Sequence, residues 1–93
     1  MDYLTNVLKH IDVTTGIDES LIISESKRPD VVGARYLAVH FLSRRGYYPH
    51  TIAAMLHKTP RCITFMLSQE ADRFATRKLL RINCALIAKE IDE

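Results

Sequence analysis

The sequence predicts an all-α fold: one small bundle of about five to six helices, formed by residues 1–93 as a single domain. Apolar residues recur three and four positions apart along most of the chain, and strand-like alternation is nowhere sustained. The three prolines stand where such periodic segments begin. With 93 residues, of which 47% are hydrophobic, the chain has enough apolar material for one compact core and too little length for two.

Two helices are expected before residue 24. The first ends at the Thr-Thr-Gly run of residues 14–16, and its apolar residues follow the i, i+3, i+4, i+7 spacing of one helix face: Leu4, Val7, Leu8 and Ile11. Asp18 is a typical N-cap residue for a short second helix through residues 21–23. The polar run at residues 24–29 then interrupts the helical pattern.

A longer helix is expected to start at the Pro29 turn or at Asp30. Its apolar residues share one face: Val31, Ala34, Leu37, Ala38, Phe41 and Leu42. Arg44 and Arg45 suit the negative end of the helix dipole, and Gly46 suits the left-handed position that follows a helix.

The segment YYPHTIAAMLHKTPRCITFMLSQ, residues 47–69, predicts two helices joined by a short turn. Pro49 fits the first turn of one helix, whose inward residues are Ile52, Ala53, Leu56 and Met55. That helix must end near His57, a residue type that tolerates the left-handed conformation better than most. Thr59 then has the chemistry of an N-cap, and Pro60 fits the first position of the next helix.

The second of these helices has separate inward and outward faces. The inward spacing is continued by Ile63, Met66, Leu67, Glu70 and Phe74. The residues left facing outward are Arg61, Thr64, Phe65 and Ser68. Two helices, a turn of three or four residues, and short polar or basic side chains at the start of the second helix are typical of a helix-turn-helix, here at about residues 49–71.

The last segment, from Asp72 to Ile91, is expected to be one long helix or a continuation of the preceding helix with a bend. Its apolar positions include Phe74, Leu79, Ile82, Leu86 and Ile91. Its basic positions are Arg73, Arg77, Lys78 and Arg81. We interpret the basic stripe as a solvated face rather than a DNA contact from Arg77 onward.

Charge is strongly segregated along the chain. Residues 27–81 contain eleven Lys or Arg and three Asp or Glu, a formal charge of +8, whereas the two ends contain two basic and eight acidic residues, a formal charge of −6. Clustered basic residues favour a polyanionic partner, because binding releases counterions from phosphates. A solvated basic face that binds nothing is an equally weighted interpretation of the charge alone.

Three motifs in the chain resemble a known family. They are the hydrophobic-Ser-x-Ser-Lys-Arg loop at residues 23–28, the Ala-Arg-x-Leu-Ala-x-x-hydrophobic-Leu helix at 34–42, and Ile-Ala-x-x-Leu at 52–56. Their order and spacing are similar to the C-terminal DNA-binding domain of the bacterial replication initiator DnaA, in the Trp-repressor-like helical superfamily. The resemblance covers about residues 15–74 and implies a bacterial, cytoplasmic module that acts in replication or transcription. It also implies that the partner is double-stranded DNA.

The chain departs from this family at the start of the recognition helix. The family signature Gly-Arg-Asp-His-Thr-Thr-Val aligns with His-Lys-Thr-Pro-Arg-Cys-Ile at residues 57–63. Because Thr-Pro replaces the base-reading Asp-His pair, we expect that this chain does not recognise the initiator's own binding box. The chain also contains no glycine-rich phosphate loop, so it does not include the initiator's ATPase domain.

The predicted DNA contacts form two groups. Those of the recognition helix are Lys58, Thr59, Arg61, Thr64, Phe65 and Ser68. Those expected at phosphates are Ser26, Lys27, Arg28, Arg44 and Arg45, of which the loop residues 26–28 are implied by the resemblance. Arg61 suits either a bidentate contact to guanine or a phosphate contact, and Thr59 is a cap before it is a base reader.

For some of these residues, a structural or protein-binding role is an alternative to DNA binding. For Arg35, a structural ion pair with Asp72 or Glu70 is at least as well supported as phosphate binding. The outward Phe65 favours a helical protein-interaction module that has lost DNA recognition, and a homodimer or a protein partner is open through Phe65 or the C-terminal helix.

Other functional classes find little support in the sequence. The four histidines and two cysteines form no strong ligand spacing, so neither a metal site nor a cofactor is expected. No nucleophile elbow, paired carboxylates or phosphate loop predicts an enzyme. The sequence shows no signal peptide or membrane span, so reduced cysteines and a cytoplasmic location are expected.

Overall fold

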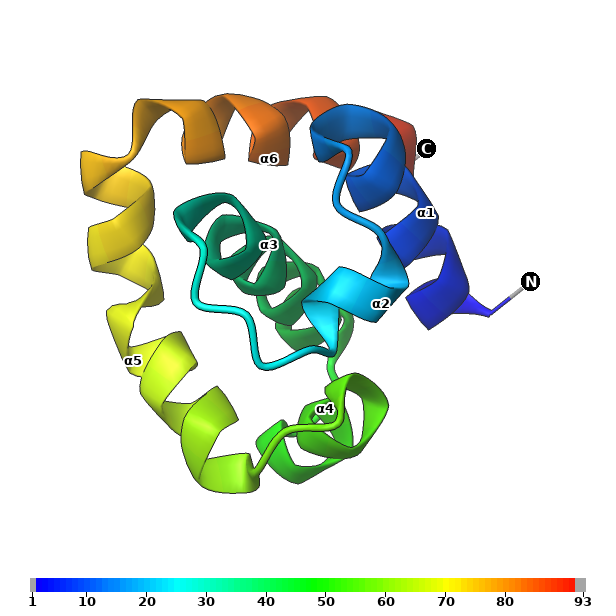
Figure 1. Ribbon diagram of the computed structural model, residues 1–93, viewed down its shortest axis with the longest axis vertical. Helices are drawn as coiled ribbons and strands as arrows, with labels where there is room; N and C mark the ends of the chain where they lie inside the picture. Colours follow the sequence, from blue (N-terminus) through cyan, green and yellow to red (C-terminus); the bar gives the residue numbers. More distant parts are fainter. Residues whose placement is uncertain (1, 92–93) are drawn as a thin grey trace.

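The computed structural model describes residues 2–91, which form six helices and no strand. In chain order these are α1 (Tyr3–Thr15), α2 (Glu19–Ile22), α3 (Pro29–Arg45), α4 (Pro49–Leu56), α5 (Pro60–Thr76) and α6 (Lys78–Ile91). The predicted all-α fold is confirmed, and the helices form a compact bundle (Figure 1).

Helix α3 is the centre of the bundle, and the other five helices contact it or each other around it (Figure 1). Its buried residues are Val31, Ala34, Arg35, Tyr36, Leu37, Ala38, Val39, Phe41 and Leu42. The six residues predicted to share one inward face are all buried. The helix also buries residues on its other sides, which a one-face pattern does not predict, because α1, α2, α4, α5 and α6 all pack against it.

Local sequence signals place the helix ends. The Asp18 carboxylate accepts a hydrogen bond from the Leu21 N–H at 3.1 Å, as its predicted cap role requires. Gly16 (φ 79°) and Gly46 (φ 110°) adopt the left-handed conformation after α1 and α3. An N-cap that the prediction did not include is Asp2, which accepts from the Thr5 N–H at 2.7 Å.

The chain turns a corner after α5. Helix α5 continues past residue 71 to Thr76, Arg77 adopts an extended conformation (φ −115°, ψ 95°), and α6 begins at Lys78. The Arg81 guanidinium holds the corner, since its Nη1 donates to the carbonyls of Phe74 at 2.8 Å and Ala75 at 2.7 Å. The bent alternative is therefore confirmed, and the single long helix is wrong.

Helix α6 packs against the bundle with a different face from the one that most of its predicted apolar positions share. Leu80 and Ile87 are buried against the bundle. Three predicted apolar positions lie outside instead: Leu79 is 69% exposed, Ile82 44% and Leu86 50%. The corner at Arg77 sets the rotation of α6, and α1 and α3 cover only the side that then faces them.

Candidate nucleic-acid interface

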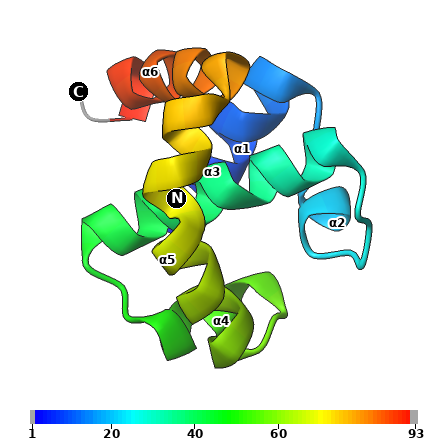
Figure 2. The same ribbon diagram turned by 90° about the vertical axis from the view of Figure 1, so that its left-hand side faces the viewer.

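Helices α4 and α5 pack as a hairpin joined by His57, Lys58 and Thr59 (Figure 2). His57 has the left-handed conformation predicted for it (φ 57°, ψ 43°), and it ends α4 as a glycine would. The Lys58 N–H donates to the Ala53 carbonyl at 2.8 Å, which closes the turn. Thr59 caps α5 by accepting from the Cys62 N–H at 3.1 Å, and Pro60 occupies the first turn.

The exposed side of α5, here termed the reading face, carries the four residues that were predicted to point outward. Arg61, Thr64, Phe65 and Ser68 are all exposed, at positions i, i+3, i+4 and i+7. Phe65, a large apolar side chain, is 61% exposed. The Ser68 hydroxyl donates its one proton to the Phe65 carbonyl at 2.6 Å, so it can act toward a ligand only as a hydrogen-bond acceptor.

The opposite side of α5 is fixed to α3. Ile63 and Met66 are buried, as predicted. Glu70, also predicted to face inward, is half-buried and pairs with Nδ1 of His40, whose ring packs against Phe74 with 4.9 Å between centroids. This packing holds the reading face in one orientation relative to the bundle.

Lys58 has a role that the sequence did not predict. Its ammonium is half-buried and donates to the carbonyls of Ile23 at 3.1 Å and Ser24 at 2.5 Å. These carbonyls belong to the loop between α2 and α3, so Lys58 ties that loop directly to the α4–α5 turn. Two of its three donors are used, and one remains for a phosphate or a base.

Arg35 holds the same loop from the other side. The side chain is only 8% exposed, and its guanidinium donates four hydrogen bonds of 2.8 to 3.4 Å. The acceptors are the carbonyls of Leu21, Ile22, Ser24 and Ser26. A structural role for Arg35 was one of the two predicted alternatives. The carboxylate partners predicted for it are wrong, because Arg35 binds backbone carbonyls, and Glu70 pairs with His40 instead.

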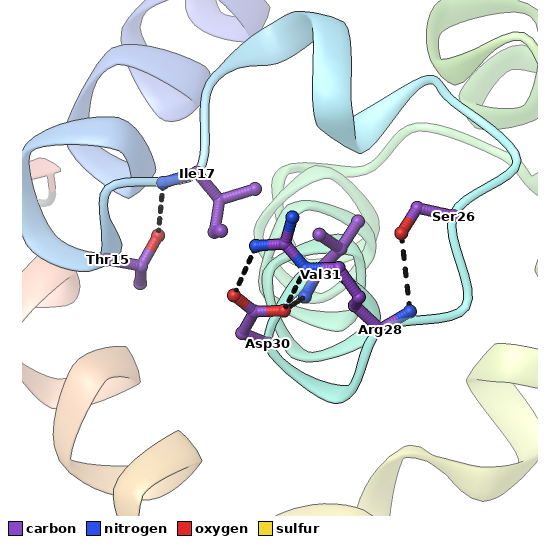
Figure 3. A network of polar contacts seen from close by, with 6 residues as sticks. All are labelled: Thr15, Ile17, Ser26, Arg28, Asp30 and Val31. Atoms are coloured by element: carbon purple, nitrogen blue, oxygen red, sulfur yellow. Dashed lines mark hydrogen bonds and ion pairs between the residues drawn. The ribbon is translucent and has the colours of Figure 1, made fainter.

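The basic residues of the loop therefore stand on a fixed backbone. Ser26 is half-buried, and its hydroxyl oxygen accepts from the Arg28 N–H at 3.3 Å (Figure 3). Lys27 is exposed. Within residues 2–91, Lys27 and Arg61 have no polar partner, so neither must break a contact to bind an anion.

Arg28 is already paired. Its Nε and Nη2 donate to the two carboxylate oxygens of Asp30 at 3.2 and 2.8 Å (Figure 3). This pairing lowers the pKa of the Asp30 carboxyl and raises that of the Arg28 guanidinium. Because both side chains are more than half exposed, a phosphate can compete for Arg28, but it must displace Asp30.

Arg44 and Arg45 lie at the other end of α3 from this loop, about 25 Å away along a helix of 17 residues (Figure 2). Both are exposed, and the Arg45 guanidinium lies over the Tyr3 ring, 4.5 Å from its centroid. With Phe41, these three residues line a surface hollow of about 250 Å³. The predicted phosphate contacts thus form two separate clusters rather than one.

Among the described residues, no three His, Cys, Asp or Glu side chains are grouped as metal ligands. Cys62 and Cys84 are both half-buried. None of the helices within residues 2–91 is long and apolar enough to cross a membrane.

Comparison of the chain with protein-family models, with curated proteins and with solved structures finds no match. The resemblance to the DnaA domain therefore stays a prediction from the three sequence motifs.

Proposed function

We propose that the chain is a double-stranded DNA-binding module in which α4 and α5 act as a helix-turn-helix. The start of α5 enters the major groove, and the loop at residues 26–28 contacts the phosphate backbone. The observation that carries the proposal is the direct link between these parts: Lys58, in the α4–α5 turn, binds two carbonyls of the basic loop.

This link matters because DNA recognition requires two contacts at a fixed separation. Backbone contacts set the position of a protein on the duplex, and base contacts read the sequence from that position. A loop held by Arg35 and Lys58 keeps Lys27 at a constant place relative to Arg61. Ordering this loop costs little on binding, since four hydrogen bonds from Arg35 and Lys58 to its carbonyls already order it.

The local chemistry supports the roles of the individual residues. An α-helix fits the major groove, and Arg61 stands in the first turn of α5, where a bidentate contact to guanine is favourable. Thr59 uses its hydroxyl oxygen as the helix cap, so its contribution to DNA binding is at most secondary. Thr64 and Ser68 follow on the same exposed face.

The motif resemblance supports the class of function but not the target site. The loop at residues 23–28 and the helix at 34–42 follow the DnaA pattern, whereas residues 57–63 do not. We therefore expect a preferred sequence that differs from the initiator's binding box, in a module that acts in replication or transcription.

A second candidate function rests on Phe65. Its 61% exposure at the centre of the reading face suits a protein partner, with the DNA code lost. Salt distinguishes the two functions, because an apolar interface persists at salt concentrations that release a protein from DNA.

The test is fluorescence anisotropy of a labelled random-sequence duplex, titrated with the protein at low and at near-physiological salt. We expect steeply salt-dependent binding, and Lys27→Ala lowers the slope of log K against log salt by about one unit. Lys89→Ala, a matched change on α6, leaves the slope unchanged. If the unmodified protein does not bind the duplex even at low salt, the DNA-binding proposal is wrong, and the protein-interaction function is then the one to test.

Arg61→Ala tests base reading. We expect this variant to lose discrimination between its preferred site and other sequences by about 1 to 3 kcal/mol, because a bidentate contact to one base is removed. The measurement is competition of specific and random duplexes against the labelled site. An equal loss for all sequences would instead make Arg61 a phosphate contact.

A further inference from the structure

The outer side of α6 carries an apolar stripe that nothing in the bundle covers. Leu79, Ile82 and Leu86 are 69%, 44% and 50% exposed. Their spacing of three and four residues puts them on one helix face, along about 10 Å of its length. Ala85, exposed beside them, leaves room for another helix to approach closely. These three large side chains share one helix face, unlike apolar residues that are scattered singly over a surface.

We propose that this stripe, formed by Leu79, Ile82 and Leu86, binds a second copy of the same chain, with the two α6 helices packed antiparallel. The stripe is self-complementary in that orientation. A two-fold axis beside Ile82 brings Leu79 of each copy against Leu86 of the other, and Ile82 against Ile82. Each large side chain then fills the space beside a partner's side chain.

The charges along α6 favour this orientation and this occupant. Arg77 and Lys78 stand at its start. Its last turn carries Lys89 and Glu90, and the sequence continues with Asp92 and Glu93, so residues 89–93 have a formal charge of −2. Antiparallel packing puts the basic start of each helix near the acidic end of the other, whereas parallel packing puts like charges together. The two helix dipoles also align favourably only when the helices are antiparallel.

The stripe is separate from the candidate DNA interface. Helix α5 has 17 residues, so α6 begins about 25 Å from the α4–α5 turn, at the opposite end of the molecule (Figure 2). The dimer therefore leaves both reading faces free, and its existence does not depend on the proposed function.

The first test is sedimentation equilibrium of the whole chain from about 10 μM to about 1 mM, the range expected for a small interface. We expect a reversible dimer, twice the 10.7 kDa chain mass. Ile82→Glu and Leu86→Glu should each abolish it, while Phe65→Glu, a matched change at another exposed apolar site, should leave it intact. Circular dichroism checks that each variant remains folded.

A monomer throughout this range overturns the proposal, and so does dissociation by Phe65→Glu with no effect of Ile82→Glu. Orientation is tested by disulfide formation in air, with Cys62 and Cys84 changed to Ser. Leu79→Cys and Leu86→Cys chains should crosslink when mixed and not separately, whereas a parallel dimer would crosslink each of them alone. The random-duplex titration of Ile82→Glu separates the two proposals, because loss of the dimer leaves DNA contacts in place.

Discussion

At the scale of single residues, Arg35 donates four hydrogen bonds to backbone carbonyls in the candidate site. A buried guanidinium is favourable only when its donors are satisfied, and here the backbone of residues 21–26 wraps around it to supply four acceptors. The cation thus specifies the path of a loop that has no regular hydrogen bonding of its own.

We expect Arg35→Met to lower the free energy of unfolding by about 3 kcal/mol or more, because it leaves buried carbonyls without donors. Urea unfolding followed by circular dichroism measures this. Arg44→Met, a matched change at an exposed position, should stay within about 0.5 kcal/mol. Equal effects of the two substitutions would contradict the structural role of Arg35.

At the scale of elements, the helix ends are set by side-chain caps whose strength depends on protonation. The pKa of Asp18 is lowered from 3.8, first by the hydrogen bond from Ser20 and then by that from the Leu21 N–H. A carboxyl group whose pKa is lower in the folded state stabilises the fold above its unfolded pKa. That contribution is lost as the pH falls through the folded value.

Comparison of the unmodified chain with Asp18→Asn tests this. Asn also caps helices but does not titrate in this range, so the unmodified chain should lose more stability than the variant between about pH 6 and about pH 3. Urea midpoints at the two pH values give the difference. If both proteins lose the same amount, Asp18 does not contribute to the acid sensitivity.

Within residues 2–91, the backbone strain of a non-glycine residue with positive φ is found in the α4–α5 turn, at His57. A left-handed conformation costs a non-glycine residue about 1 to 2 kcal/mol, and glycine removes this strain from the folded state. Glycine also raises the conformational entropy of the unfolded chain, which offsets part of the stabilisation. We therefore expect His57→Gly to raise the free energy of unfolding by about 0.5 to 1 kcal/mol. Gly46→Ala should lower it by a similar amount, because a Cβ there meets no atom within 4 Å and only the backbone is strained. Destabilisation by His57→Gly would show that the imidazole makes a stabilising contact.

At the scale of the whole molecule, the central position of α3 divides the basic surface. The loop at its start is tied to the α4–α5 turn, whereas Arg44 and Arg45 lie at its far end. We expect Arg44→Ala to lower the salt dependence of DNA binding by less than Lys27→Ala does, measured in the same duplex titration. An equal or larger effect of Arg44→Ala would mean that the duplex contacts both ends of α3.

The sequence by itself determined where most of the helices begin, the caps at Asp18 and Thr59, and the outward face of α5, because these depend on neighbours a few positions away. Pro49, Thr59 and Pro60 mark their boundaries through local hydrogen bonding and fixed backbone angles. Only the tertiary structure decided which carbonyls receive Arg35 and Lys58, and that Leu79, Ile82 and Leu86 face outward. Those outcomes depend on the corner at Arg77 and on contacts between residues nine or more positions apart, which packing geometry decides and helical periodicity does not.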